Sequence, residues 1–203
     1  MSRDAVELSP DAVMRCAAPV RWTTALPKTP SPAIVYVTMS HTIRPFANAD
    51  WRSLWPILRE TFATGDTYGY SPNSTEAETR QIWIDAPLAT YVACDDNGAI
   101  IGTYKLVINQ PGLGSHVSNC GYVVSTAARG QGLASLMCEH SQTEAVRLGF
   151  RAMQYNLVVS TNTGAVRLWQ KHGFAIVGTL PGAFNHATLG YVDAFVMFKQ
   201  LVT

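Results

Sequence analysis

The stretch Arg129-Gly130-Gln131-Gly132-Leu133-Ala134-Ser135 decides the fold of this chain. It follows the apolar run Tyr122-Val123-Val124 and opens a segment of helical periodicity from Leu133 to Leu148, so that a strand passes through a glycine turn into a helix. Glycines allow a tight turn and a close approach of the backbone to a ligand. Because the first amides of a helix lack intrahelical partners and the helix dipole favours negative charge there, the stretch predicts a phosphate site, to which Arg129 adds a cation.

Three kinds of phosphate site are compatible with two glycines before a helix. A Walker loop requires Gly-Lys-Ser/Thr, whereas Gly132 is followed by Leu133 and Ala134, which excludes it. A dinucleotide fingerprint requires an acidic residue about 20 positions further on, and residues 151–155 hold no carboxylate. The third kind, Arg-x-x-Gly-x-Ala, is a cradle for the diphosphate of coenzyme A. A tight turn that binds nothing stays open as an alternative, because the loop alone is weak evidence.

Length and composition favour one folded domain that binds no nucleic acid. The chain has 203 residues, of which 47% are hydrophobic and 14% charged, enough to bury a core. Its net charge is +1 and it carries no basic stripe, which argues against nucleic acid. The four cysteines show no Cys-x-x-Cys spacing and no partner histidines, so no metal site is predicted and a reducing compartment is indicated.

The chain is expected to divide at about residue 40. Five of the eleven prolines fall within residues 1–40 and no periodic pattern survives there, which predicts a loosely ordered extension before a domain at 41–203. A strand at 33–38 is the alternative. No apolar run approaches the ~18 residues of a membrane helix, and the amino terminus lacks the pattern of a secretory signal. We therefore expect a cytoplasmic protein; a homodimer is left open.

The pattern of the domain predicts a mixed α/β sheet. Asp96-Asn97-Gly98 is a strong hairpin signal between two strands. Ser74 is expected to cap the second helix. The predicted order is β-α-α-β-β-β-α-β-α-β-β, with strands at 42–45, 90–95, 99–108, 116–124, 152–159, 174–179 and 191–201, and helices from Trp51, from about Ser74, at 133–148 and at 163–171.

A second constellation lies downstream, in Asn162-Thr163-Gly164-Ala165-Val166-Arg167-Leu168-Trp169-Gln170-Lys171-His172-Gly173-Phe174. Asn162 follows a strand and is placed to cap the next helix, and its amide is able to bond an extended ligand between two strands. Helix capping and core packing account for most of these residues, but they do not account for the pairing of this stretch with the loop at 129–135.

The two stretches together resemble the GNAT (Gcn5-related N-acetyltransferase) superfamily over about residues 41 to 201. Within it the chain is similar to small-molecule acetyltransferases, including the fungal type that acetylates proline analogues. The resemblance implies a single-domain, mostly antiparallel sheet of about seven strands with about four helices, splayed between the strand at 116–124 and the strand at 152–159. It further implies acetyl-CoA as cofactor, bound in that opening. The implied cofactor-binding residues are Tyr122, Val123, Val124, Arg129, Gly130, Gln131, Gly132, Leu133, Ala134, Ser135 and Asn162.

One position departs from the family pattern. Many members carry a tyrosine seven residues after the motif asparagine, as acid for the leaving thiolate, and here that position is Trp169. An indole does not serve as a proton source. Since a thiol of pKa near 8.5 leaves as thiolate at pH 7 for only about 2 kcal/mol, this change is expected to slow transfer without abolishing it.

Candidates for the acceptor site lie in strands and loops around the expected opening. Asn119 and Asn156 are polar residues in apolar strands and are predicted to hold a small polar amine and a water that carries its proton away; bonding to local backbone is the alternative. Tyr68, Tyr70 and Phe184 are loop candidates for closing over the substrate, or else exposed loop aromatics.

The predicted activity is direct acetyl transfer to a small amine, an amino acid or an analogue, within a ternary complex. Acetylation of a protein amino terminus or lysine is a second enzymatic alternative. A non-catalytic acyl-CoA-binding module is a third, made conceivable by the missing tyrosine.

Overall fold

The computed structural model describes residues 41–202. The predicted amino-terminal extension lies outside these residues. The strands are β1 (Thr42–Pro45), β2 (Ala89–Cys94), β3 (Ile100–Ile108), β4 (Val117–Val124), β5 (Ala152–Val159), β6 (Ala175–His186) and β7 (Gly190–Gln200); the helices are α1 (Trp51–Ala63), α2 (Glu76–Arg80), α3 (Leu133–Arg147) and α4 (Thr163–Lys171), with short helical turns η1 (Asn48–Asp50), η2 (Gln81–Asp85), η3 (Gly112–Gly114) and η4 (Thr126–Ala128).

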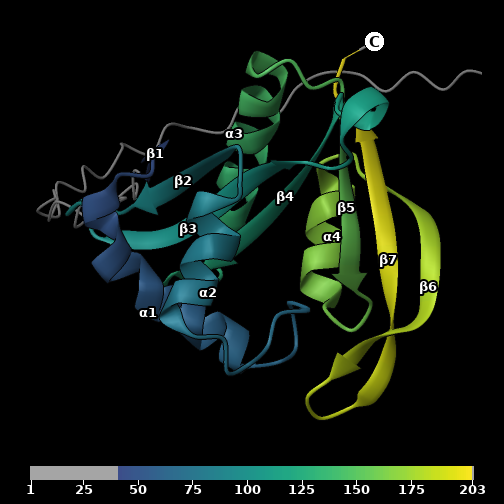
Figure 1. Ribbon diagram of the computed structural model, residues 1–203, viewed down its shortest axis with the longest axis horizontal. Helices are drawn as coiled ribbons and strands as arrows, with labels where there is room; N and C mark the ends of the chain where they lie inside the picture. The colour runs from purple at the N-terminus through teal and green to yellow at the C-terminus, as the bar shows by residue number, and fades with distance from the viewer. Residues whose placement is uncertain (1–40, 203) are drawn as a thin grey trace, which may run out of the picture. The chain divides into compact units, whose positions relative to one another are not determined.

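These elements form a seven-stranded mixed sheet in the order β1-β2-β3-β4-β5-β7-β6 (Figure 1). Every neighbouring pair is antiparallel except β4 and β5, which are parallel and are connected through α3. The predicted order of strands and helices is confirmed, as is the α/β fold class. Parallel neighbouring strands cannot be joined by a tight turn and need a long crossover connection, which the predicted helix at 133–148 supplies.

Helices cover both faces of the sheet, because alternate residues of the central strands are apolar on both sides. On one face α3 buries Met137 and Cys138 against Tyr104 of β3 and Trp169 of α4. On the other face α1 packs Leu54, Leu58 and Phe62 around Trp83 and Val123. The consequence for the site is that residues of odd number in β3 and β4 face α1, whereas residues of even number face α3.

Two local details differ from the sequence prediction. The cap of α2 is Thr75, not Ser74, because Thr75 accepts from the Glu78 amide at 3.3 Å while the Glu78 carboxylate accepts from the Thr75 amide at 2.8 Å. Strand β6 continues to His186, far beyond the predicted end at 179. Its register against β7 shifts between Leu180 and Phe184, and this irregularity hides the strand from a periodicity analysis.

Candidate functional site

The sheet opens between β4 and β5. These strands pair at just two positions, Val117 with Ala152 and Ser118 with Met153. Beyond them β4 continues to Val124 and β5 to Val159, and the two strands diverge (Figure 1). The predicted splay is therefore present, and it leaves main-chain groups on both strands without a strand partner along the opening.

The groups that β4 presents to this opening are those of Tyr122 and Val124. Antiparallel pairs alternate in hydrogen bonding, and the Ser125 amide donates to the Ile101 carbonyl of β3 at 2.9 Å. Hydrogen-bonded positions recur at every second residue, so the main-chain groups of Val123, two residues before Ser125, also point toward β3. The main chain of Tyr122 therefore faces the opposite way, and its carbonyl accepts from the Tyr68 hydroxyl at 2.9 Å.

The glycine loop leaves a row of amides free at the start of α3. Gly130 and Gly132 have φ of 76° and 81°, which only glycine adopts readily, and Gly132 ends the loop as the residue preceding the helix. Among residues 41–202 no acceptor meets the main-chain amides of residues 130–134. Five successive free amides beside Arg129 and the positive end of a 15-residue helix form a site for a diphosphate.

A cavity of about 830 Å³ joins this loop to the opening in the sheet. Most of the predicted site residues line it: Tyr68, Tyr70, Asn119, Tyr122, Val124, Arg129, Gly130, Gly132, Leu133, Ala134, Ser135, Asn156 and Asn162. The Asn162 side chain also caps α4, as predicted, by accepting from the Ala165 amide at 3.1 Å.

Three predicted residues are not brought to the cavity. Val123 is buried against α1 and its main chain is paired with β3. The Gln131 side chain turns back, and its Nε2 donates to the Ala127 carbonyl at 3.1 Å. Phe184 lies in β6 opposite Val192 and is 5% exposed, so it is a strand residue with a packing role and its placement in a loop over the substrate is wrong.

The aromatic loop after α1 forms the wall at the other end of the cavity. Tyr68 and Tyr70 stack with centroids 5.5 Å apart, and both rings contact Phe62. They are half-buried and fixed by a cluster that includes Trp83, so their alternative interpretation as exposed loop aromatics is wrong. An aromatic wall of this kind excludes water and limits the size of an acceptor.

The two asparagines differ in their hydrogen bonding. Asn156 donates to the Asn109 side chain at 2.7 Å and accepts from the Gln154 side chain at 2.8 Å. Within the described part of the chain the Asn119 amide has no hydrogen-bond partner, although it lines the cavity opposite Val107. Its donor and acceptor are therefore free for a ligand, and Asn156 retains one free amide hydrogen.

Sequence reasoning missed Lys105, which lines the cavity from the middle of β3. Its ammonium group donates to the Tyr70 hydroxyl at 3.0 Å and to the Ile82 carbonyl at 2.7 Å. Burial lowers the pKa of this ammonium from its usual value to about 8. The signal that could have found it is a lone lysine in the apolar run Ile100–Ile108.

The described cavity lacks the side chains that most often act as general bases. Within residues 41–202 no histidine or carboxylate lines it. Cys120 lines it, but burial raises the pKa of that thiol far above neutral pH. Trp169 packs its ring 4.8 Å from Tyr122 and 5.1 Å from Tyr155. The arrangement therefore binds and orients reactants and provides no covalent carrier.

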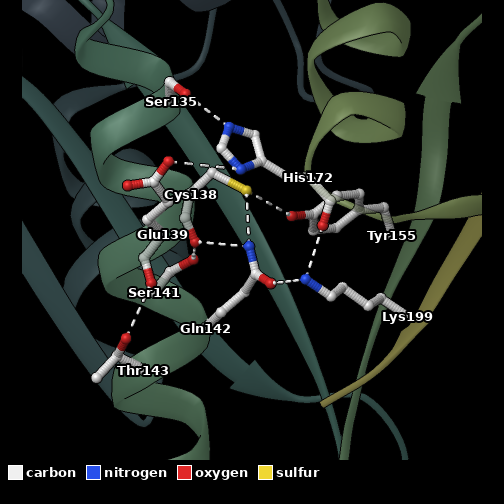
Figure 2. A network of polar contacts seen from close by, with 9 residues as sticks. All are labelled: Ser135, Cys138, Glu139, Ser141, Gln142, Thr143, Tyr155, His172 and Lys199. Carbon is white, nitrogen blue, oxygen red and sulfur yellow. Dashed lines mark hydrogen bonds and ion pairs between the residues drawn. The ribbon is translucent and has the colours of Figure 1, made fainter.

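A polar network fastens the loop end of the cavity to the far half of the sheet (Figure 2). Ser135, in the first turn of α3, lies 2.6 Å from Nε2 of His172, which ends α4. Lys199 of β7 donates to the His172 carbonyl at 2.7 Å and also to the side chain of Gln142. Because β4 and β5 are barely paired, these contacts help to hold α3 and α4 together across the opening.

Two features are not found in residues 41–202. None of its helices combines the length and apolar character that a membrane crossing requires. Its histidine, cysteine and acidic side chains form no group of three or more that could hold a metal ion.

An α/β sheet that opens beside a helix N-terminus with free amides defines a protein that binds an acyl-CoA. The family model for the acetyltransferase (GNAT) family matches residues 51–174, and the chain belongs to this family. The family's cofactor, acetyl-CoA, fits the cavity on three features: the free amides of residues 130–134, the neighbouring Arg129 and the free main chain of β4.

Known proteins resemble the chain in sequence and in structure. A GCN5-related N-acetyltransferase from Kribbella flavida is 41% identical, with a TM-score of 0.75 over 79% of this chain and 97% of that one. N-acetyltransferase aca1 of Schizosaccharomyces pombe is 31% identical over 112 residues, which span 55% of this chain and about half (54%) of aca1. A phosphinothricin acetyltransferase from Sinorhizobium meliloti, solved with acetyl-CoA, shares the fold with a TM-score of 0.73 at 23% identity, over 81% and 90% of the two chains.

Proposed function

We propose that this protein is an acetyl-CoA-dependent N-acetyltransferase that acts on a small amine, an amino acid or an amino-acid analogue. The observation that carries the proposal is one cavity with two unlike ends. One end presents the free amides of residues 130–134, and the other is walled by Tyr68 and Tyr70 next to Asn119. Two stacked rings that are fixed at this end fit a small acceptor better than a peptide. The relative from Sinorhizobium meliloti, which is named for a small amino-acid-like acceptor, agrees with this size.

The residues of the chain would share the binding of the donor. The amides of residues 130–134 and the Arg129 guanidinium would hold the diphosphate. The main-chain groups of Tyr122 and Val124 would bond the pantetheine arm, because they face the opening and lack a strand partner. Acetyl-CoA supplies the acetyl group as an activated thioester.

Transfer would be direct. The neutral amine of the acceptor attacks the thioester carbonyl, the carbon–sulfur bond breaks, and a main-chain amide of β4 stabilises the oxyanion. No carboxylate or histidine lines the described cavity, so a water held by Asn119 or Asn156 would take the proton of the amine to solvent. Burial raises the pKa of the Cys120 thiol, so this thiol is a poor nucleophile, and direct transfer needs no acyl-enzyme. The thiolate leaves without help from a tyrosine at the Trp169 position.

A substrate panel tests this proposal. The protein is incubated with acetyl-CoA, a panel of amino acids and a thiol reporter. Release of thiol with one small amine is expected. Release only with peptides would replace the proposal with protein acetylation, and binding of acetyl-CoA without any release would replace it with a non-catalytic module.

Two variants and a control locate the activity. Asn119→Ala and Asn156→Ala are expected to lower kcat/KM about 10- to 100-fold, since each removes a hydrogen bond to the acceptor or its water. Asn97→Ala, in the exposed turn between β2 and β3, is the matched control and should leave kcat/KM unchanged. Unchanged rates in both cavity variants would remove these two residues from the mechanism.

The buried free thiols of Cys94, Cys120 and Cys138 also support a cytoplasmic location as part of this proposal, because reducing compartments preserve them.

A further inference from the structure

Lys105 and Asn119 lie on the same face of the sheet, beside the acceptor end of the cavity. In the pairing of β3 with β4, Lys105 is opposite Gly121 and Val107 is opposite Asn119. Lys105 and Asn119 are therefore diagonal neighbours on the face covered by α1 and α2. Because Gly121 has no side chain, nothing from β4 stands directly opposite the lysine stem.

The ammonium group of Lys105 retains donor capacity. It lies 5.3 Å from the centre of the Tyr70 ring and 5.0 Å from that of Trp83, and it makes two hydrogen bonds, to Tyr70 and Ile82. An ammonium carries three donors, so one is left for a ligand. The partners that it has are neutral and do not cancel its charge.

The charge of Lys105 has no carboxylate partner in residues 41–202. It is 9% exposed, and a buried ion of this kind is costly unless an opposite charge meets it. The charged side chains that line the described cavity are Lys105 and Arg129, and both are cations. Arg129 follows the end of β4 in the glycine loop, whereas Lys105 lies beside the middle of that strand, so they serve different parts of a ligand.

We propose that Lys105 binds the carboxylate of the amine acceptor and restricts the enzyme to amines that carry such a group. This inference rests on the proposed function. The carboxylate would accept from the free donor of the ammonium and from the Asn119 amide, which points the amino group of an α-amino acid toward the opening between β4 and β5. The ligand would thereby supply the negative charge that the cavity lacks.

The test compares a free amino acid with its carboxamide as acceptor, in the wild type and in Lys105→Met. The donor is acetyl-CoA and the readout is thiol release. In the wild type, kcat/KM is expected to favour the free acid. In Lys105→Met this preference should fall about 10- to 100-fold, chiefly through a higher KM for the free acid, since a charge-assisted hydrogen bond is lost. Lys171→Met, an exposed lysine in α4, is the matched control and should retain the preference.

Other outcomes overturn the inference. The inference is wrong if the wild type accepts the free acid and the carboxamide equally. It is also wrong if Lys105→Met keeps the preference for the free acid, because Lys105 would then not bind the carboxylate. An equal loss of kcat for both acceptors would identify Lys105 as a base or a packing residue. Lys105→Gln repeats the comparison, and circular dichroism verifies that each variant is folded.

A binding measurement separates this inference from the proposed function. Calorimetry of the CoA-loaded protein with the same amino acid should give about 10- to 100-fold weaker binding in Lys105→Met. If the wild type releases no thiol with any amine, the proposed function is wrong, and calorimetry still decides whether Lys105 binds a carboxylate. Equal affinities of wild type and variant for the amino acid would contradict the inference about Lys105 and would leave the proposed acetyl transfer unaffected.

Discussion

The Tyr68 hydroxyl donates to the main-chain carbonyl of Tyr122 at 2.9 Å, and this bond fastens the aromatic loop after α1 to the open edge of β4. The glycine at position 121 leaves room for this contact, since an ideal Cβ there would lie 3.1 Å from the Tyr68 hydroxyl oxygen, a tight approach. The wall of the acceptor end and the strand that faces the donor are thus one connected unit.

Tyr68→Phe should loosen this wall while it preserves the ring packing. We expect the free energy of unfolding to fall by about 1 kcal/mol, because one hydrogen bond is lost, and KM for the acceptor to rise more than KM for acetyl-CoA. Urea unfolding and initial rates measure the two effects. Tyr191→Phe, at a tyrosine that is 77% exposed, should change neither. An acceptor KM that stays constant would separate the loop from substrate binding.

Gly132→Ala should weaken acetyl-CoA binding beyond its effect on folding. At φ of 81° an alanine costs about 1–2 kcal/mol, and its methyl group would disturb the free amides of the loop. Gly98→Ala is the matched control, because Gly98 has φ of 78° in the turn between β2 and β3 and is equally free of neighbours. Both variants should lose similar stability, and calorimetry should show weaker acetyl-CoA binding for Gly132→Ala alone. Equal affinities would place the diphosphate elsewhere.

The stability difference between wild type and Lys105→Met should depend on pH. The folded-state pKa of Lys105 is about 8, below its unfolded value of about 10.5, so between these values the unfolded chain binds more protons. Stability of the wild type relative to the variant therefore rises with pH across this window, by up to about 3 kcal/mol. The Tyr70 hydroxyl and the Cys120 thiol, which face the ammonium in the wild type, are present in both proteins, so their own titration largely cancels in the difference. Urea unfolding from pH 7 to 10.5 measures it, and a flat difference would mean that the lysine titrates normally.

Trp169→Tyr should speed the chemical step. A phenol at this position could protonate the leaving thiolate. If it removed the whole free-energy difference between releasing a thiolate and releasing a thiol at pH 7, the rate would rise by up to about 30-fold. Trp169→Phe has no acid and serves as the control for lost packing against Tyr122 and Tyr155. Single-turnover rates at saturating acetyl-CoA compare the two. If both variants slow transfer equally, the indole has a packing role and proton supply does not limit the rate.

The sequence predicted those features that depend on local chemistry. The glycine loop could be located because only glycine adopts the φ values at residues 130 and 132. The hairpin at 96–98 could be located because the Asp95 carboxylate accepts from the amides of Asn97 and Ala99, both at 2.9 Å, as short polar turns do. Placement of Asn119 and Asn156 at one cavity followed from the resemblance to a family with a known sheet order.

Features that depend on tertiary context escaped prediction. Phe184 closely follows Pro181 and Gly182, so the segment resembles a loop, yet pairing with β7 makes it a strand. Val123 was grouped with its neighbours, although alternation along β4 turns every second residue away from the opening. Lys105 gave no motif, because its role depends on the absence of an acidic neighbour, which no pattern in the primary sequence records.

The opening between β4 and β5 also affects how the protein behaves when it is stored or heated. Two bare strand edges in the middle of a sheet resemble the exposed edges from which proteins aggregate, since any extended chain can pair with them. A pantetheine arm with its two amide groups would cover one of these edges, much as an additional β-strand would. Preparations that are stripped of coenzyme A should therefore turn turbid at lower temperature than preparations supplied with it.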